Sequence, residues 1–118
     1  MAKFRFQDLE IWQLSIELAD ELFDLADLLE NMRHYRFAEQ LRGAGLSPSN
    51  NIAEGSGSDS KKEFAYFLNV AKRSTFENAN MILLMRRRGL IDSDVEGRIL
   101  EDMDKLSRKI TSFKNSLK

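Results

Sequence analysis

Residues 60–89 read SKKEFAYFLNVAKRSTFENANMILLMRRRG, and this stretch decides the fold class of the 118-residue chain. Its apolar residues recur every three or four positions, the spacing that places them on one face of an α-helix. Ser60 and Glu63 match a capping box, in which the serine accepts a hydrogen bond from a free backbone N–H at the helix start. Gly89 follows three arginines, where glycine supplies a left-handed turn and cations face the negative end of the helix dipole. We predict a helix over residues 61–88.

Three further segments carry a helical pattern, which predicts helices over residues 8–30, 33–54 and 94–116. Residues 93–96 match a second capping box, and Gly55 is placed to end the second helix in a left-handed conformation. Pro48 removes a backbone hydrogen bond inside that helix, so we expect a kink near Pro48, the alternative being a full break. The sequence therefore predicts an all-α fold, with residues 1–118 forming one domain, an antiparallel up-and-down four-helix bundle.

The apolar residues exceed what the core of one small bundle can hide. The first helix has two apolar stripes, one of Leu9, Trp12, Ile16, Ala19, Phe23 and Ala26 and the other of Ile11, Leu14, Leu18, Leu22, Leu25 and Leu29. Residues 81–85, near the end of the third helix, are apolar nearly all round, whereas the fourth helix has a single narrow stripe. Contiguous apolar excess marks a partner surface, and self-association is its commonest use in a small protein. We therefore expect a homo-oligomer.

The composition excludes several classes of protein and site. The chain has no cysteine, which excludes disulfides, a thiolate nucleophile and a cysteine zinc site and fits a reducing, cytoplasmic location. No apolar run reaches the roughly 20 residues of a membrane span, so no membrane partner is expected. The single histidine has no partner for a metal site, and no nucleophile and base can be paired. We predict no enzyme activity, no catalytic or metal-ligating residue, no cofactor and no small-molecule substrate.

The charges are unevenly distributed, although 18 basic residues nearly balance 19 acidic ones. Residues 1–30 hold two basic and eight acidic residues, a net charge of −6, whereas residues 56–90 hold seven basic and three acidic, a net charge of +4. On the third helix Lys62, Tyr66, Arg73 and Arg87 project to the side away from the core, and Arg86 and Arg88 adjoin them. Such a surface suits RNA phosphates. The alternative is that it meets the acidic face of the first helix, in the same subunit or the next.

The string Asn51-Ile52-Ala53-Glu54-Gly55 is the most distinctive local motif. Asn51 and Glu54 are three residues apart and can bond backbone groups near the helix end; a ligand or nucleic-acid contact is the alternative. This string, Phe6-x-x-Leu9-x-x-Trp12, Gln40-Leu41-Arg42 and the pattern from Phe67 through Ser74 to Glu77 resemble the four-helix-bundle family encoded in intervening sequences of bacterial 23S ribosomal RNA genes. The resemblance covers residues 6–91.

This resemblance implies a homopentameric ring and a relation to the accessory protein of diversity-generating retroelements, which binds nucleic acid and a reverse transcriptase. It also implies that Asn51, Glu54, Ser74 and Glu77 matter for structure or function. The retroelement relatives are strongly basic, whereas this chain has a pI of about 5.9. The leading hypothesis is a non-enzymatic oligomeric scaffold that binds ribosomal or other RNA. The alternative is a protein-docking module without nucleic-acid binding.

Overall fold

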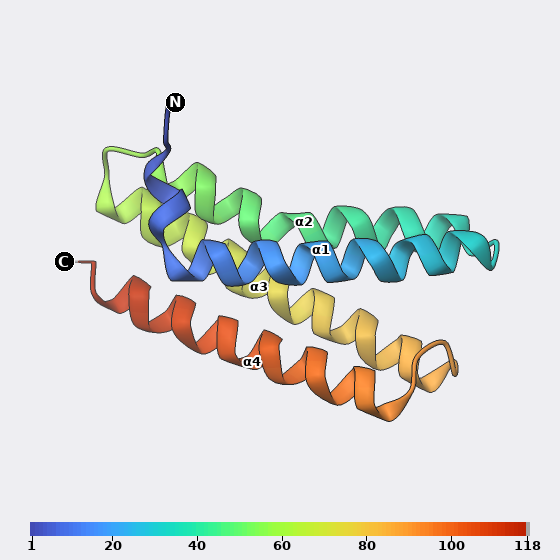
Figure 1. Cartoon of the computed structure of the whole chain (residues 1–118). Coiled ribbons are helices and arrows are strands. Elements are labelled where there is room, and N and C mark those ends of the chain that lie inside the picture. The colour runs from blue at the N-terminus through green and yellow to red at the C-terminus, as the bar shows by residue number, and fades with distance from the viewer. Residues whose placement is uncertain (118) are drawn as a thin grey trace.

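A computed structural model of the chain describes residues 1–117 and consists of helices joined by short turns (Figure 1). Within that range lie a short 3-10 helix, η1, at Arg5–Asp8 and four α-helices, with no strand. The four are α1 at Glu10–Asn31, α2 at Tyr35–Ser56, α3 at Lys61–Arg87 and α4 at Ser93–Asn115. The prediction of an all-α chain with four helices is confirmed.

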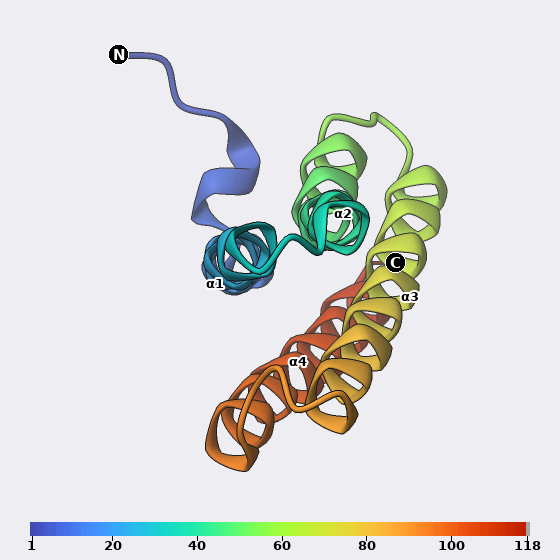
Figure 2. The same ribbon diagram turned by 90° about the vertical axis from the view of Figure 1, so that its right-hand side faces the viewer.

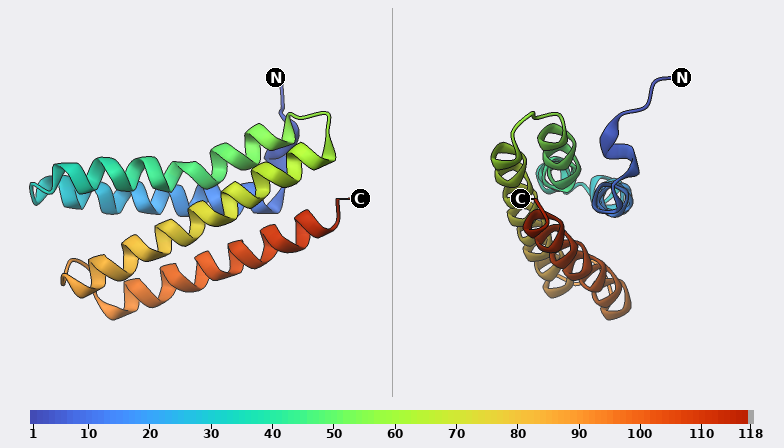
Figure 3. Two further views of the ribbon diagram at one scale, coloured as in Figure 1. Left: turned by 180° about the vertical axis from the view of Figure 1, so that it is seen from behind. Right: turned by 90° about the vertical axis from the view of Figure 1, so that its left-hand side faces the viewer.

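The helices form two layers, one of α1 and α2 and the other of α3 and α4 (Figure 1). Both described ends of the chain lie at one end of the molecule, and the α1–α2 and α3–α4 turns both lie at the other end. The end-on view shows the second layer crossing the first at an angle, with α2 against α3 (Figure 2). Seen from behind, α3 lies close to α2 near the turn that joins them and diverges from it toward the other end (Figure 3). Two turns that are far apart in sequence therefore lie at the same end of the molecule.

The core runs between the two layers and takes side chains from all four α-helices. Leu22, Leu41, Ile82 and Ile99, one from each helix, are fully buried. In α1 the stripe of Leu18, Leu22, Leu25 and Leu29 faces this core, whereas Ile16 of the other stripe stays exposed. Burial of each large aliphatic side chain contributes roughly 1.5–3 kcal/mol, so the core stripe is the main reason that α1 docks.

The helix ends test the capping predictions. Ser60 Oγ accepts a hydrogen bond from the Glu63 N–H at 3.2 Å, and Gly89 has φ +73°, as the sequence predicted for both. The second capping box was wrong, because Asp92 caps α4 in place of Ser93 and accepts from the Val95 N–H at 2.9 Å. An aspartate is as good an N-cap as serine, and its negative charge also favours the helix N-terminus.

The second helix continues through Pro48 without a break, and the kink stays a prediction. Gly55 does not form the left-handed cap that the sequence predicts, since the helix runs on to Ser56. It is buried where α2 approaches α3, and a Cβ at this position would lie 2.7 Å from Phe67 Cβ. Gly55 is thus a close-packing residue, which the local sequence did not distinguish from a turn residue.

Ion pairs join α1 to both of its neighbours. Arg42 of α2 donates hydrogen bonds to Asp27 at 2.7 Å and Glu30 at 3.0 Å, and these bonds raise the pKa of Arg42 above its ordinary value. Along the opposite side, Lys109 of α4 donates to Glu10 at 2.9 Å and Arg98 pairs with Glu21. All of these pairs are at the surface, where a single ion pair contributes little and is screened by salt. They orient α1 more than they stabilise it.

The pair between Glu10 and Lys109 predicts a pH dependence. The hydrogen bond and charge of Lys109 hold the pKa of Glu10 below its ordinary value of 4.5. A carboxyl with a lowered folded pKa stabilises the fold above its ordinary pKa, and this contribution disappears as the pH falls through the lowered value. We expect Lys109→Met to lower the thermal midpoint at pH 7, with the difference from the wild type disappearing at lower pH.

The control for this pair is Glu10→Gln, which removes the titrating carboxyl. In that background Lys109→Met should have no further effect, because the partner of the lysine is already neutral. Thermal unfolding of the four proteins between pH 2 and pH 7 gives the comparison. A Lys109→Met effect of equal size at all pH values would contradict the prediction.

Candidate functional site

A chain of hydrogen bonds links α2 to α3 around the motif residues Asn51 and Ser74. The Asn51 side-chain amide donates to the Ser47 carbonyl at 2.9 Å and to Ser47 Oγ at 3.1 Å. Ser47 Oγ lies 2.7 Å from Ser74 Oγ, and Ser74 in turn donates to the Val70 carbonyl at 2.9 Å. Since Ser74 donates to Val70, the Ser47 hydroxyl donates to Ser74, so the whole chain runs in one direction. Asn51 and Ser74 are therefore engaged in holding two helices together.

The other two motif residues, Glu54 and Glu77, are exposed, and their side chains form no hydrogen bond or ion pair within residues 1–117. The expected bond from Glu54 to the helix end is therefore not made. Glu77 borders a polar groove of about 550 Å³ between α2 and α3, with Gln40 and Asn80 beside it and Gly43 and Ala44 in its wall. Within the described residues, Asn51 and Ser74 thus join α2 to α3, whereas Glu54 and Glu77 form no such bond.

The six candidate contact residues on the third helix do not form one site. Lys62 lies in the first turn of α3, and Arg86, Arg87 and Arg88 lie at its other end. At 1.5 Å per residue, Lys62 and Arg87 are about 37 Å apart along the helix axis. Tyr66 and Arg73 are exposed between them. A single compact ligand cannot touch all six.

The fold instead places arginines from two turns at the same end of the molecule (Figure 1). Arg33 and Arg36 flank the α1–α2 turn, and Arg86, Arg87 and Arg88 end α3; together we call these five residues the arginine end. All five are exposed. Within residues 1–117 the one ion pair that any of the five forms is that of Arg86 with Glu96, at 3.9 Å. The other four guanidinium groups form no ion pair in that range, although the exposed carboxylates of Asp92 and Asp94 lie at the same end of the molecule.

The backbone at the arginine end is strained at one position. Arg33 has φ +68°, in the left-handed region, and it is the only residue other than glycine with positive φ among the described residues. This conformation costs a non-glycine residue roughly 1–2 kcal/mol. Arg33 directly follows the C-cap of α1, where its N–H donates to the Glu30 carbonyl at 2.9 Å and the His34 N–H donates to the Leu29 carbonyl at 2.8 Å. These are the two hydrogen bonds of a Schellman motif, so the positive φ serves to end the helix.

The family described as "23S rRNA-intervening sequence protein" matches residues 7–112. The chain belongs to this family. It is also similar to the 1.70 Å crystal structure of a protein of unknown function from the S23 ribosomal protein family of Bacteroides thetaiotaomicron. The TM-score is 0.83 at 23% identity, and the match covers 88% of this chain and 97% of the other. No curated protein sequence matches the chain.

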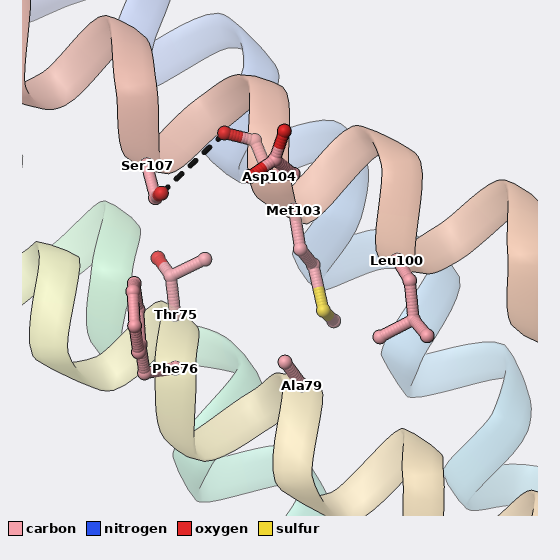
Figure 4. A pocket seen from close by; sticks show the side chains of 7 residues that line it. All are labelled: Thr75, Phe76, Ala79, Leu100, Met103, Asp104 and Ser107. Atoms are coloured by element: carbon pink, nitrogen blue, oxygen red, sulfur yellow. Dashed lines mark hydrogen bonds between the residues drawn. The ribbon is translucent and has the colours of Figure 1, made fainter.

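This member of the family carries two features that the sequence analysis missed. Arg33 and Arg36 were not among the candidate residues, because only the tertiary fold places their turn at the same end of the molecule as Arg86, Arg87 and Arg88. The second feature is an exposed aromatic ring at Phe76, beside the hollow between α3 and α4 (Figure 4). Phe76 lies one helical turn after Lys72 and Arg73, and residues at this spacing are neighbours on a helix surface. The sequence alone could therefore have placed the ring beside the two cations.

Two further properties of this family member concern metals and membranes. Among residues 1–117, no cluster of histidine, aspartate or glutamate side chains is placed to hold a metal ion. None of the described helices has the length and hydropathy of a membrane span.

Proposed function

We propose that the protein is a non-enzymatic, cytoplasmic scaffold that assembles into a homopentamer and binds RNA through its arginine end. The gathering of five exposed arginines from two distant turns carries this proposal. Arginine is well suited to phosphate, because its planar guanidinium donates several hydrogen bonds and stays charged at any physiological pH. The net charge of −1 for the whole chain does not oppose binding, since the electrostatic contact is local.

Assembly would strengthen such a contact. In a cyclic oligomer every subunit is related to the next by one rotation, so all copies of the arginine end lie on the same side of the ring. Several weak phosphate contacts then act together, because after the first has formed the others bind at high effective concentration. A pentamer would present 25 arginines to one RNA. The pentameric state itself is proposed from the resemblance to the family and from the exposed apolar side chains.

Filter binding to an RNA hairpin over a series of salt concentrations tests RNA binding. If the arginine end contacts phosphates, the logarithm of the affinity falls linearly with the logarithm of the salt concentration. The double variant Arg36→Gln/Arg87→Gln should reduce this slope by about two, one for each phosphate that the variant no longer binds. The double variant removes one arginine from beside each of the two turns, so the prediction depends on both turns contacting the RNA.

The matched control removes two cations from the opposite end of the molecule, Lys62→Gln and Lys114→Gln. The slope should remain that of the wild type, although the change in net charge is the same. An equal reduction of the slope in both double variants would show that the charge of the whole protein matters and not the arginine end. No retention of the hairpin at low salt would overturn RNA binding altogether.

A second candidate function is docking of a protein partner at the same end. Leu28, Met32 and Tyr35 are exposed beside Arg33 and Arg36, and apolar groups of this kind favour a protein partner over phosphates. Affinity purification from the native cell, with and without nuclease, separates the two functions. A partner retained after nuclease treatment favours protein docking, and RNA recovered only without nuclease favours the first proposal.

A further inference from the structure

An apolar groove of about 330 Å³ opens between α1 and α2 on the outer surface. We call it the α1–α2 groove; its lining residues are Ile16, Glu17, Ala19, Asp20, Phe23 and Leu46. Ile16 is 36% exposed and Leu46 38% exposed, so the apolar lining is open to solvent. A cavity of about 150 Å³ is enough to hold benzene in a protein interior, and this groove therefore has room for an aromatic side chain.

The rim of the α1–α2 groove is acidic and uncompensated. Four carboxylates of α1 are paired within the chain, namely those of Glu10, Glu21, Asp27 and Glu30. Glu17 and Asp20, which line the groove, are exposed and form no ion pair within residues 1–117. The same holds for Asp24, one turn beyond Asp20. A partner for this groove should therefore present an apolar group flanked by positive charge.

The third helix presents a surface of that kind around Phe76. The Phe76 ring is 62% exposed and lines a hollow of about 320 Å³ together with Asn69, Lys72 and Arg73. Neither Lys72 nor Arg73 forms an ion pair in the described part of the chain. On the other side of the ring, Ala79, Leu100 and Met103 extend the apolar surface toward α4 (Figure 4). We call this the Phe76 surface.

The two surfaces cannot meet within one molecule, because they lie on opposite faces. Glu21 pairs with Arg98 of α4, and Phe23 is two residues further along α1, about 200° around the helix and so directed away from α4. Likewise Ser74 bonds Ser47 of α2, and Phe76 is two residues further along α3, directed away from α2. The α1–α2 groove therefore faces outward from one layer and the Phe76 surface outward from the other. Their complementary charges cannot be paired within one molecule, whereas a second copy of the chain can pair them.

We propose that the Phe76 surface of one copy docks in the α1–α2 groove of the next, with Lys72 and Arg73 facing Glu17 and Asp20. This inference rests on the self-assembly proposed above and specifies its contact. Because the two surfaces differ and face opposite ways, the contact is head-to-tail, and its repetition gives a closed ring if the rotation closes. The arginine end takes no part and stays free in the assembly.

Charge reversal tests this contact directly. The wild type is measured first by multi-angle light scattering at micromolar concentration, followed by the single variants Asp20→Arg and Arg73→Asp. Each single variant places like charges across the proposed contact, and we expect both to run as monomers. The double variant Asp20→Arg/Arg73→Asp restores opposite charges at every contact and should recover the wild-type mass. Phe76→Ala should weaken association at least tenfold without affecting the fold, since the ring is exposed.

The controls are Glu101→Arg on α4 and Lys62→Asp at the start of α3, two exposed charges outside both surfaces, which should leave the mass unchanged. Circular dichroism shows whether each variant is folded. A monomeric wild type would overturn the self-assembly itself. An oligomeric wild type that both reversals and Phe76→Ala leave intact, or that the double reversal does not restore, would overturn only this contact. If a reversal variant fails to fold, Phe76→Ala still decides the question.

Discussion

Replacing Gly55 with alanine is expected to lower the free energy of unfolding by about 1–3 kcal/mol, although alanine is the better helix former. A Cβ at Gly55 would lie 2.7 Å from Phe67 Cβ and 2.9 Å from Phe64 Cδ1. Phe67 Cβ is attached directly to the backbone of α3, so rotation of the side chain cannot relieve the contact. The helices must separate, and overpacking of this kind costs about 1–3 kcal/mol. The gain in helix propensity is at most about 1 kcal/mol, so the clash decides the sign.

Gly43→Ala is the matched control, because Gly43 lies in the same helix and a Cβ there would have no heavy atom within 4 Å. This substitution should raise the free energy of unfolding by up to about 1 kcal/mol through helix propensity alone. Urea unfolding of the wild type and the two variants measures both effects. A Gly55→Ala variant that is as stable as Gly43→Ala would show that α2 and α3 are not as closely packed as described.

Leu22→Ala should have the largest effect of any single substitution considered, lowering the free energy of unfolding by about 2–5 kcal/mol. Leu22 is fully buried in α1 at the centre of the core. The substitution forgoes the transfer free energy of the side chain and creates a cavity that the neighbouring helices only partly fill. Since domains of this size have total stabilities of about 5–15 kcal/mol, the variant is expected to be partly unfolded near physiological temperature.

The packing of Leu22 against α2 makes a second, sharper test. A Cβ added at Gly45 would lie 3.1 Å from Leu22 Cδ1, so in Gly45→Ala this close contact opposes the gain in helix propensity. When Leu22 is already alanine, the new methyl group enters the space that the leucine occupied. The double variant should therefore be more stable than the sum of the two single effects predicts, by about 0.5–3 kcal/mol in a double-mutant cycle. Additive effects would contradict direct packing of the two residues.

Local signals in the sequence identified most elements of the fold. The cap at Ser60 and the turn at Gly89 were predicted because each depends on a few adjacent residues with a definite conformational preference. The same reasoning placed the α4 cap one residue late, since Asp92 and Ser93 are both good caps. It also misassigned Gly55, because glycine serves equally in a left-handed turn and where two helices lie close together.

The candidate site was predictable only in part. The arginines at 86–88 were identified from their position at the end of a helix, and the free cation at Arg73 from the charge pattern. Arg33 and Arg36 were missed because they are about 50 residues away in sequence. For the basic face of α3 the sequence left two alternatives open, contact with RNA phosphates or contact with the acidic face of α1 in the same subunit or the next.

The sequence by itself determined the four helices and the unequal division of charge between the first and the third, because helical periodicity and capping are local properties of the chain. The tertiary structure decided which of these charges are neighbours. Docking the helices in two layers pairs the carboxylates of Glu10, Glu21, Asp27 and Glu30 of α1 with cations of α2 and α4. It leaves Glu17, Asp20 and Asp24 without an ion pair among residues 1–117. It also places the two turns at the same end of the molecule. Both outcomes depend on packing between residues distant in sequence, which no local pattern encodes.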